Sequence, residues 1–211
     1  DAKDYFEKTA PKFDYKFKKV ISIKEVKEYT NSSYIYKIKV KKNKKIETVY
    51  LKHSKDYLKL KELKFFVGAK RLICEVKTMR YFEKLFGPSV VPHVIFFDKK
   101  NFSLVMSDIH GKGRRLINEF YRNNVHPEIG SRLGHILGLL HATTYGTRKM
   151  VRESEDNREF INLSIRFKTN VGIEMCAKET LDLIEESRKS KNSVIWGDAI
   201  IKNMVVEKGR V

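Results

Sequence analysis

The chain has 211 residues, of which 41% are hydrophobic and 11% aromatic, and its formal net charge is +18 at pH 7. This length and composition suffice for a buried core and exclude an intrinsically disordered chain. No apolar run approaches the roughly 18 residues of a membrane-spanning helix, and the first residues lack the apolar stretch of a signal peptide. We therefore expect a cytoplasmic protein that makes no membrane contact.

The positive charge predicts attraction to polyanions through phosphate neutralisation, so nucleic acid has to be considered as a partner. The lysines of the first third, however, alternate with apolar residues, as in "YIYKIKVKK", which is typical of the solvent side of strands. No zinc-knuckle spacing, GxxG loop or RRM-type aromatic motif accompanies them. We expect any binding of nucleic acid to be sensitive to salt and indifferent to base sequence.

The first half of the chain predicts an antiparallel sheet. Runs rich in β-branched and aromatic residues, separated by polar turns, occupy residues 20–26, 34–40 and 48–53. The segments "HVIFFD" and "FSLVMS", joined by "KKN", predict a hairpin. Between the strands and the hairpin one helix is expected, because apolar side chains fall on a single helical face ahead of the breakers in "GPSVVP". That face comprises Leu72, Val76, Met79, Phe82 and Phe86.

The second half is predicted to be helical. Apolar residues from Ile129 to Leu140 repeat with a helical period, which predicts a buried central helix between His126 and Gly146. Two further amphipathic helices are expected within residues 155–189, followed by a strand at "NMVV". The predicted fold class is α+β, with an antiparallel-sheet lobe over residues 1–107 and a helical lobe over residues 108–211.

The segment "VIWGDAIIKNMVV" contains the most specific chemical pattern of the chain. Asp198 and Asn203 are five residues apart on a loop that enters a strand, so their side chains can converge on one point. Phosphoryl transfer uses such a pair, because an Asp orients the attacking hydroxyl while an Asn oxygen holds the Mg²⁺ that neutralises the phosphates. The structural alternative is a pair of turn-forming residues that cap the loop.

Two upstream residues fit the same chemistry. Lys52, in "VYLKH", lies on the third predicted strand, from which an ammonium group can reach the phosphates of a nucleotide. Glu75, in "RLICEVKTM", lies on the following helix and can pair with Lys52 to hold it extended. We therefore predict an ion pair between strand and helix.

The chain resembles the aminoglycoside phosphotransferase and choline kinase group of kinase-like enzymes, with methylthioribose kinase among the similar members. Residues 20–211 carry the resemblance, which rests on "SSYIYKIKV", "VYLKH", "ICEVKTMRYF", "VPHVIFFDKKNFSLVMSDIHG", "IGSRLGHILGLLHATTYG" and "VIWGDAIIKNMVV". It implies a two-lobed protein-kinase-like fold and an ATP-dependent, Mg²⁺-dependent phosphotransferase. The acceptor would be the hydroxyl of a small molecule.

The resemblance also implies a role for each matching residue. Lys52 would contact the nucleotide phosphates, Glu75 would position Lys52, Asp198 would be the catalytic base and Asn203 a Mg²⁺ ligand. The backbone of a hinge formed by Ser107 to Ile109, preceded by Met106, would bind adenine, with Ile35 and Val205 above and below the ring. The phosphate loop, "EYTNSSY", contains no glycine, so backbone amides and the hydroxyls of Ser32 and Ser33 would hold the phosphates.

The sequence departs from the pattern of this group at two points. Trp196 stands where the group usually has a His before Gly-Asp, and the second metal-binding Asp of the group would be expected only beyond Val211. Two other functions therefore remain open from the sequence. One is a non-catalytic, nucleotide-binding protein that acts as an interaction module, and the other is a basic nucleic-acid-associated protein.

Overall fold

The computed structural model describes residues 1–27, 32–58, 66–109, 111, 113–124, 127–147, 182 and 201–207. These residues divide into two compact units, Asp1–Asp108 and Ile109–Val211. The two helices predicted within residues 155–189 and the candidate base Asp198 lie outside the described residues. In the described part, no helix is both long enough and apolar enough to cross a membrane.

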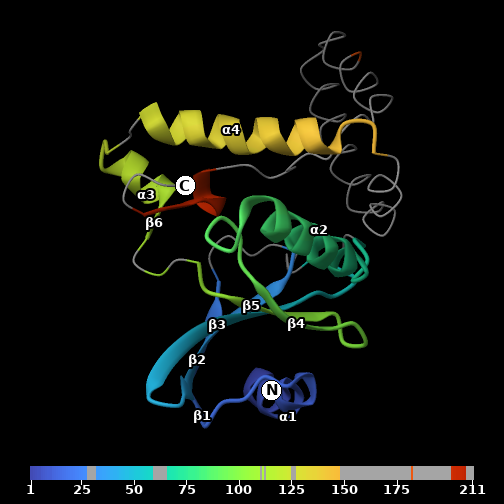
Figure 1. The fold of residues 1–211 in the computed structure, drawn as a ribbon. Coiled ribbons are helices and arrows are strands. Elements are labelled where there is room, and N and C mark those ends of the chain that lie inside the picture. Colours follow the sequence, from blue (N-terminus) through green and yellow to red (C-terminus); the bar gives the residue numbers. More distant parts are fainter. Residues whose placement is uncertain are drawn as a thin grey trace. The chain divides into compact units, whose positions relative to one another are not determined.

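The first unit is built around one antiparallel sheet of five strands, with the order β1-β2-β3-β5-β4 (Figure 1). The strands are β1 (Lys19–Val26), β2 (Tyr34–Lys42), β3 (Lys45–His53), β4 (Val94–Asp98) and β5 (Ser103–Ser107). The three-strand meander and the later hairpin predicted from the sequence are thus confirmed. The α+β class is confirmed as well, because helices accompany this sheet.

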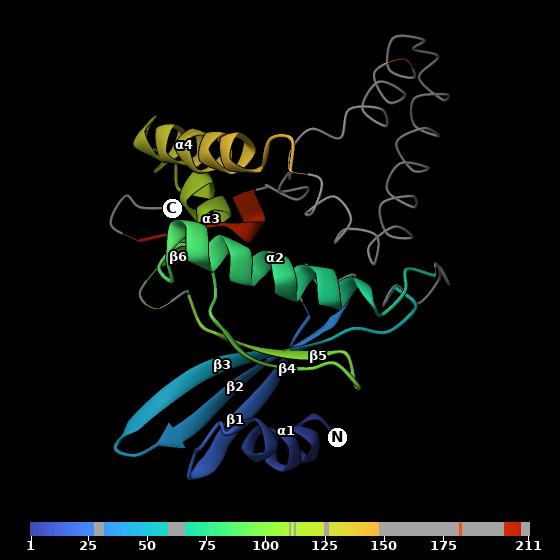
Figure 2. The same ribbon diagram turned by 45° about the vertical axis from the view of Figure 1, so that its right-hand side comes forward.

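Helices cover both faces of the sheet, as Figures 1 and 2 show for this unit. The predicted helix forms as α2 (Arg71–Phe86) and packs its buried Leu72 and Val76 against Val94 of β4 and Leu104 of β5. On the opposite face lie α1 (Ala2–Thr9) and the 3-10 helix η1 (Ala10–Phe13), which the sequence pattern did not predict.

The face under α1 holds the larger apolar cluster of this unit. Phe6 of α1 is fully buried against the inward-pointing side chains of the sheet and contacts the rings of Tyr15 and Phe17. Two hydrogen bonds join this layer to the sheet, from the Tyr5 hydroxyl to Asp98 Oδ2 at 2.7 Å and from the Tyr15 hydroxyl to Glu47 Oε1 at 2.9 Å. The sheet residues of the cluster are Ile38, Val40, Val49, Leu51, Phe96 and Val105.

The second unit contains α3 (Leu116–Tyr121), α4 (Pro127–Thr144) and the 3-10 helix η3 (Ile201–Asn203). Two short strands, β6 (Arg114–Arg115) and β7 (Val205–Val206), pair antiparallel. The core beneath them joins Leu116, Ile129 and Met204, and the Leu116 amide donates to the Met204 carbonyl at 3.0 Å. A segment near the end of the chain is thereby tied to the start of this unit.

The helix predicted between His126 and Gly146 is present as α4, and its burial is confined to one edge. Ile129, Leu140 and Thr144 are buried on α4, whereas many of its other residues are exposed. The reason lies in the sequence, because the helix contains glycines, Arg132 and His135 as well as its leucines and isoleucines. The helix is therefore amphipathic, with one buried edge.

Candidate functional site

The candidate site in the first unit is centred on Lys52. This residue is near the end of β3, where its cross-strand neighbours are Ile35 of β2 and Leu104 of β5. Strand residues alternate between faces, and Val49 and Leu51 belong to the cluster under α1. Lys52 therefore points to the face on which α2 lies.

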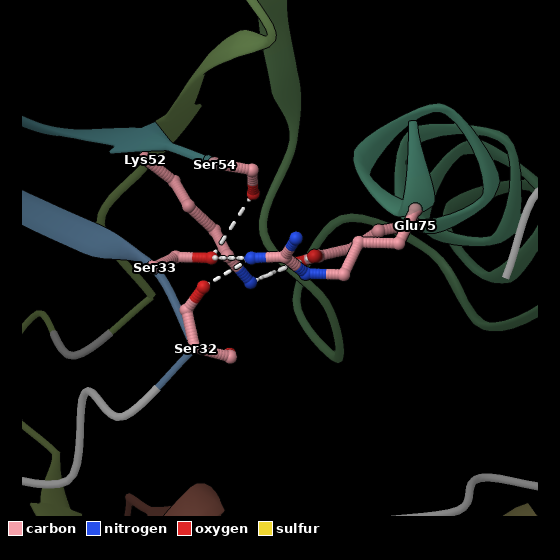
Figure 3. A network of polar contacts seen from close by, with 6 residues as sticks. Ser32, Ser33, Lys52, Ser54 and Glu75 are labelled. Carbon is pink, nitrogen blue, oxygen red and sulfur yellow. Dashed lines mark hydrogen bonds and ion pairs between the residues drawn. The ribbon is translucent and has the colours of Figure 1, made fainter. Parts of the chain in front are cut away.

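Glu75 of α2 faces Lys52, and the predicted ion pair is confirmed. The Lys52 ammonium donates to both carboxylate oxygens of Glu75, at 2.5 Å and 2.7 Å. The side chains are 17% and 35% exposed, so the pair is neither sealed in the core nor fully solvated. Figure 3 shows the two side chains reaching toward each other from strand and helix.

A second cation, Arg71, lies one helical turn before Glu75. Its guanidinium is buried and donates to the Gly68 and Lys55 carbonyls, each at 2.7 Å, and to the Ser32 carbonyl. Burial lowers the pKa of Arg71, while the nearby charges of Glu75 and Asp56 act in the opposite direction. The residue thus fastens the N-terminal end of α2 to the segment that precedes β2.

Sequence reasoning missed Arg71, although a signal was present. A basic residue in the first turn of a helix opposes the helix dipole, and Arg71 opens α2, whose first turn contains no acidic side chain. Such an unfavourable placement calls for a compensating partner. Here the compensation comes from main-chain carbonyls of three other segments.

Ser32 and Ser33 are both part of this network (Figure 3). The Ser33 hydroxyl is buried, lies 3.0 Å from the Ser54 hydroxyl and accepts from Arg71 at 3.4 Å. Ser32 contributes its carbonyl to the same guanidinium. Both serines therefore help to fix the end of the predicted phosphate loop, and direct phosphate contacts from their hydroxyls stay a prediction.

The predicted adenine-binding residues of the first unit lie on two strands. Ile35 is half-buried on β2 opposite Lys52, and Met106 of β5 pairs with Tyr50, which shares the Lys52 face. The Ser107 amide donates to the His93 carbonyl at 2.9 Å, and the Ser107 hydroxyl accepts from the His93 amide at 2.8 Å. These bonds hold the end of β5, the start of the predicted hinge, in a fixed conformation.

The other predicted residues belong to the second unit. Ile109 is its first residue and is half-buried. Asn203 ends η3 and is exposed, and Val205 on β7 pairs with Arg115. The buried Met204 between them fixes this segment, because its side chain enters the core and its carbonyl accepts from Leu116.

The structure thus brings Lys52, Ile35 and Met106 onto one face of the sheet, with Glu75 of α2 opposite Lys52. Among the described residues, no three His, Cys, Asp or Glu side chains gather as a metal site. Comparison with known proteins adds no relative, since no protein-family model and no curated protein matches the sequence. Functional assignment therefore rests on the chemistry of the residues themselves.

Proposed function

We propose that this protein is an ATP-dependent phosphotransferase with a kinase-like arrangement of two lobes, and that it transfers the γ-phosphate to a hydroxyl group of a small molecule. The observation that carries this proposal is the ion pair between Lys52 on β3 and Glu75 on α2. It was predicted from the order of a strand lysine and a helix glutamate along the chain. Its geometry suits a lysine that must stay extended toward anionic phosphates.

The pair is favourable for this role for a physical reason. A free lysine side chain samples many rotamers, and fixing it costs conformational entropy. Glu75 holds the Lys52 ammonium through two oxygens, so the lysine side chain is already ordered before any ligand binds. The partial exposure of both side chains leaves the ammonium accessible to an additional anionic oxygen.

The Arg71 network supports the same proposal. Backbone amides must be held rigidly if a loop without glycine is to bind phosphates. Arg71 bonds the Ser32 carbonyl and the Ser33 hydroxyl at the end of that loop, and it is on the same helix as Glu75. Loop, helix and Lys52 are therefore linked in one polar network, and this favours a binding role for the whole assembly.

The remaining roles are proposed for residues of the second unit. Asn203 is an exposed residue on a segment anchored by Met204. Its amide oxygen is a suitable ligand for Mg²⁺, which usually takes one or two protein ligands besides phosphates. Asp198 would orient the acceptor hydroxyl. The bound Mg²⁺ and ATP would supply charge neutralisation and the transferable phosphoryl group.

A pair of variants tests the two roles. Asp198→Asn should leave ATP affinity nearly unchanged and greatly reduce turnover, because its contact matters mainly in the transition state. Asn203→Ala should raise the Mg²⁺ requirement and weaken ATP binding. If both residues only form turns, each change should lower stability by about 1 kcal/mol, with ATP binding untouched. ATP binding by the wild type without any transfer would instead indicate the non-catalytic alternative.

A further inference from the structure

Lysines gather on one open sheet face of the first unit. Lys37, Lys39 and Lys41 of β2 alternate with Ile38 and Val40, which are fully buried under α1, so the lysines point to the opposite side. Cross-strand pairing places Lys19 opposite Lys41 and Lys24 opposite Lys37. We call the surface formed by Lys19, Lys24, Lys37, Lys39 and Lys41 the lysine face.

Helix α2 does not cover the lysine face. Its buried contacts are with β4 and β5, at the other end of the strand order, and Figures 1 and 2 show it above those two strands. Lys19, Lys24, Lys39 and Lys41 are accordingly exposed. The ammonium groups of the lysine face are therefore accessible on this side of β1 and β2.

The charges of the lysine face are not balanced within the described residues. The acidic residues of β1 to β3 are Glu25 and Glu47, which pair with Tyr36 and Val40 and so point toward α1. Within the described ranges, none of the exposed lysines of this face has an ion-pair partner. The two pairs of directly opposed lysines repel each other, which destabilises the sheet.

The neighbours of these lysines are mostly polar, although Lys41 also pairs with the exposed Ile46. Lys39 has Ser22 on one side and Thr48 on the other, and Lys37 Nζ lies 5.6 Å from the centre of the Tyr50 ring. Hydroxyl groups and lysines together are the side chains that bind phosphate oxygens of nucleic acids, and an aromatic ring offers a surface for stacking a base. A lipid surface would instead require a cluster of apolar side chains that can insert.

We propose that the lysine face binds the phosphate backbone of single-stranded nucleic acid, with no preference for base sequence. Bound phosphates would neutralise the opposed lysines and release counterions, so binding becomes weaker as salt rises. This inference is independent of the proposed phosphotransferase function, because none of the lysines that define the face belongs to the Lys52–Glu75–Arg71 network.

The test uses the whole chain and a short fluorescent single-stranded RNA of mixed sequence, with affinity measured across a salt series. Replacing Lys24, Lys39 and Lys41 together by Gln should flatten the slope of log affinity against log salt by about 2, since each lost phosphate contact changes it by roughly 0.7. The matched control replaces the exposed Lys3, Lys8 and Lys12, on the α1 side, by Gln. It removes the same charge and should leave the slope nearly unchanged.

Three results would overturn the proposal. The first is equal flattening of the salt slope in the two triple variants, which would mean diffuse attraction to the whole surface. The second is absence of RNA binding at low salt. The third is binding to vesicles of equal parts phosphatidylcholine and phosphatidylserine without binding to RNA. Should the triple variant fail to fold, the single variant Lys39→Gln tests the same point. It should flatten the slope by about 0.7, and an unchanged slope would contradict the proposal.

Discussion

The two faces of the five-stranded sheet differ in what they bury and in what they leave accessible. The face under α1 is apolar, with Phe6, Ile38 and Val49 fully buried, and its hydroxyl groups make hydrogen bonds to carboxylates. The other face packs an apolar cluster against α2 and also presents cations, namely Lys52 and the lysine face. The comparison teaches that one side of this sheet supplies stability, whereas the other presents the cations on which both proposals rest.

The largest expected effect is on the stabilising face. Phe6→Ala should lower the free energy of unfolding by about 3–5 kcal/mol, because it removes a fully buried ring and leaves a cavity. Chemical denaturation measures the loss. If the two faces are independent, affinity of the remaining folded protein for ATP and for RNA should match that of the wild type. A loss of under about 1 kcal/mol would show that α1 is dispensable to the sheet.

Arg71 gives the next largest effect and connects stability with binding. Arg71→Met should destabilise the protein by about 3 kcal/mol, because the carbonyls of Ser32, Lys55 and Gly68 lose a buried donor. Arg71→Lys keeps the charge but not the planar fork, so it should recover only part of this stability. Hydrogen exchange of the backbone amides of Ser32 and Ser33, which Arg71 contacts, should become faster in both variants. Unchanged exchange would contradict the role of Arg71 in holding this loop.

A smaller effect is expected for the hydrogen bonds of the stabilising face. Tyr15→Phe removes the bond to Glu47 while keeping the ring, so it should cost about 1 kcal/mol. Burial, together with this bond and the charge of Glu47, raises the pKa of Tyr15. Spectrophotometric titration of tyrosine should therefore show one fewer high-pKa phenol in Tyr15→Phe. Loss of a phenol that titrates near the ordinary value of about 10 would contradict this contact.

The smallest effect concerns pH. Burial raises the pKa of Tyr5 from 10.0 to about 12; for Asp98, burial acts to raise the pKa, but hydrogen bonds from Asn101 and Tyr5 outweigh it and hold the pKa below 3.8. Because the pKa of Tyr5 is raised on folding, this group stabilises the folded state fully below pH 10.0 and loses that contribution as the pH rises further. Because the pKa of Asp98 is lowered on folding, this group stabilises the folded state above pH 3.8 and loses that contribution as the pH falls further. Asp98→Asn should therefore flatten the loss of stability on the acid side. An unaltered acid transition would show that Asp98 is not one of the groups responsible.

The sheet was predictable because its strands alternate strongly between apolar and polar residues, as in β2. The Lys52–Glu75 pair was predictable from the order of strand and helix. The helix α1 was missed, although Asp1 and Asp4 form a capping box that marks its start. The opposition of Lys19 with Lys41 and the contacts of Arg71 depend on cross-strand register and on segments far apart in the chain, which local patterns do not specify.

Lys52 provides the most direct test of the central claim that this site binds the phosphates of ATP. Isothermal titration calorimetry with ATP and Mg²⁺ should detect binding by the wild type, and Lys52→Met should weaken it at least about tenfold, which corresponds to about 1.4 kcal/mol. Lys55→Met is the matched control, because Lys55 is a nearby exposed lysine and should change the affinity little. Absence of ATP binding by the wild type, or equal affinity in wild type and Lys52→Met, would contradict the proposed function.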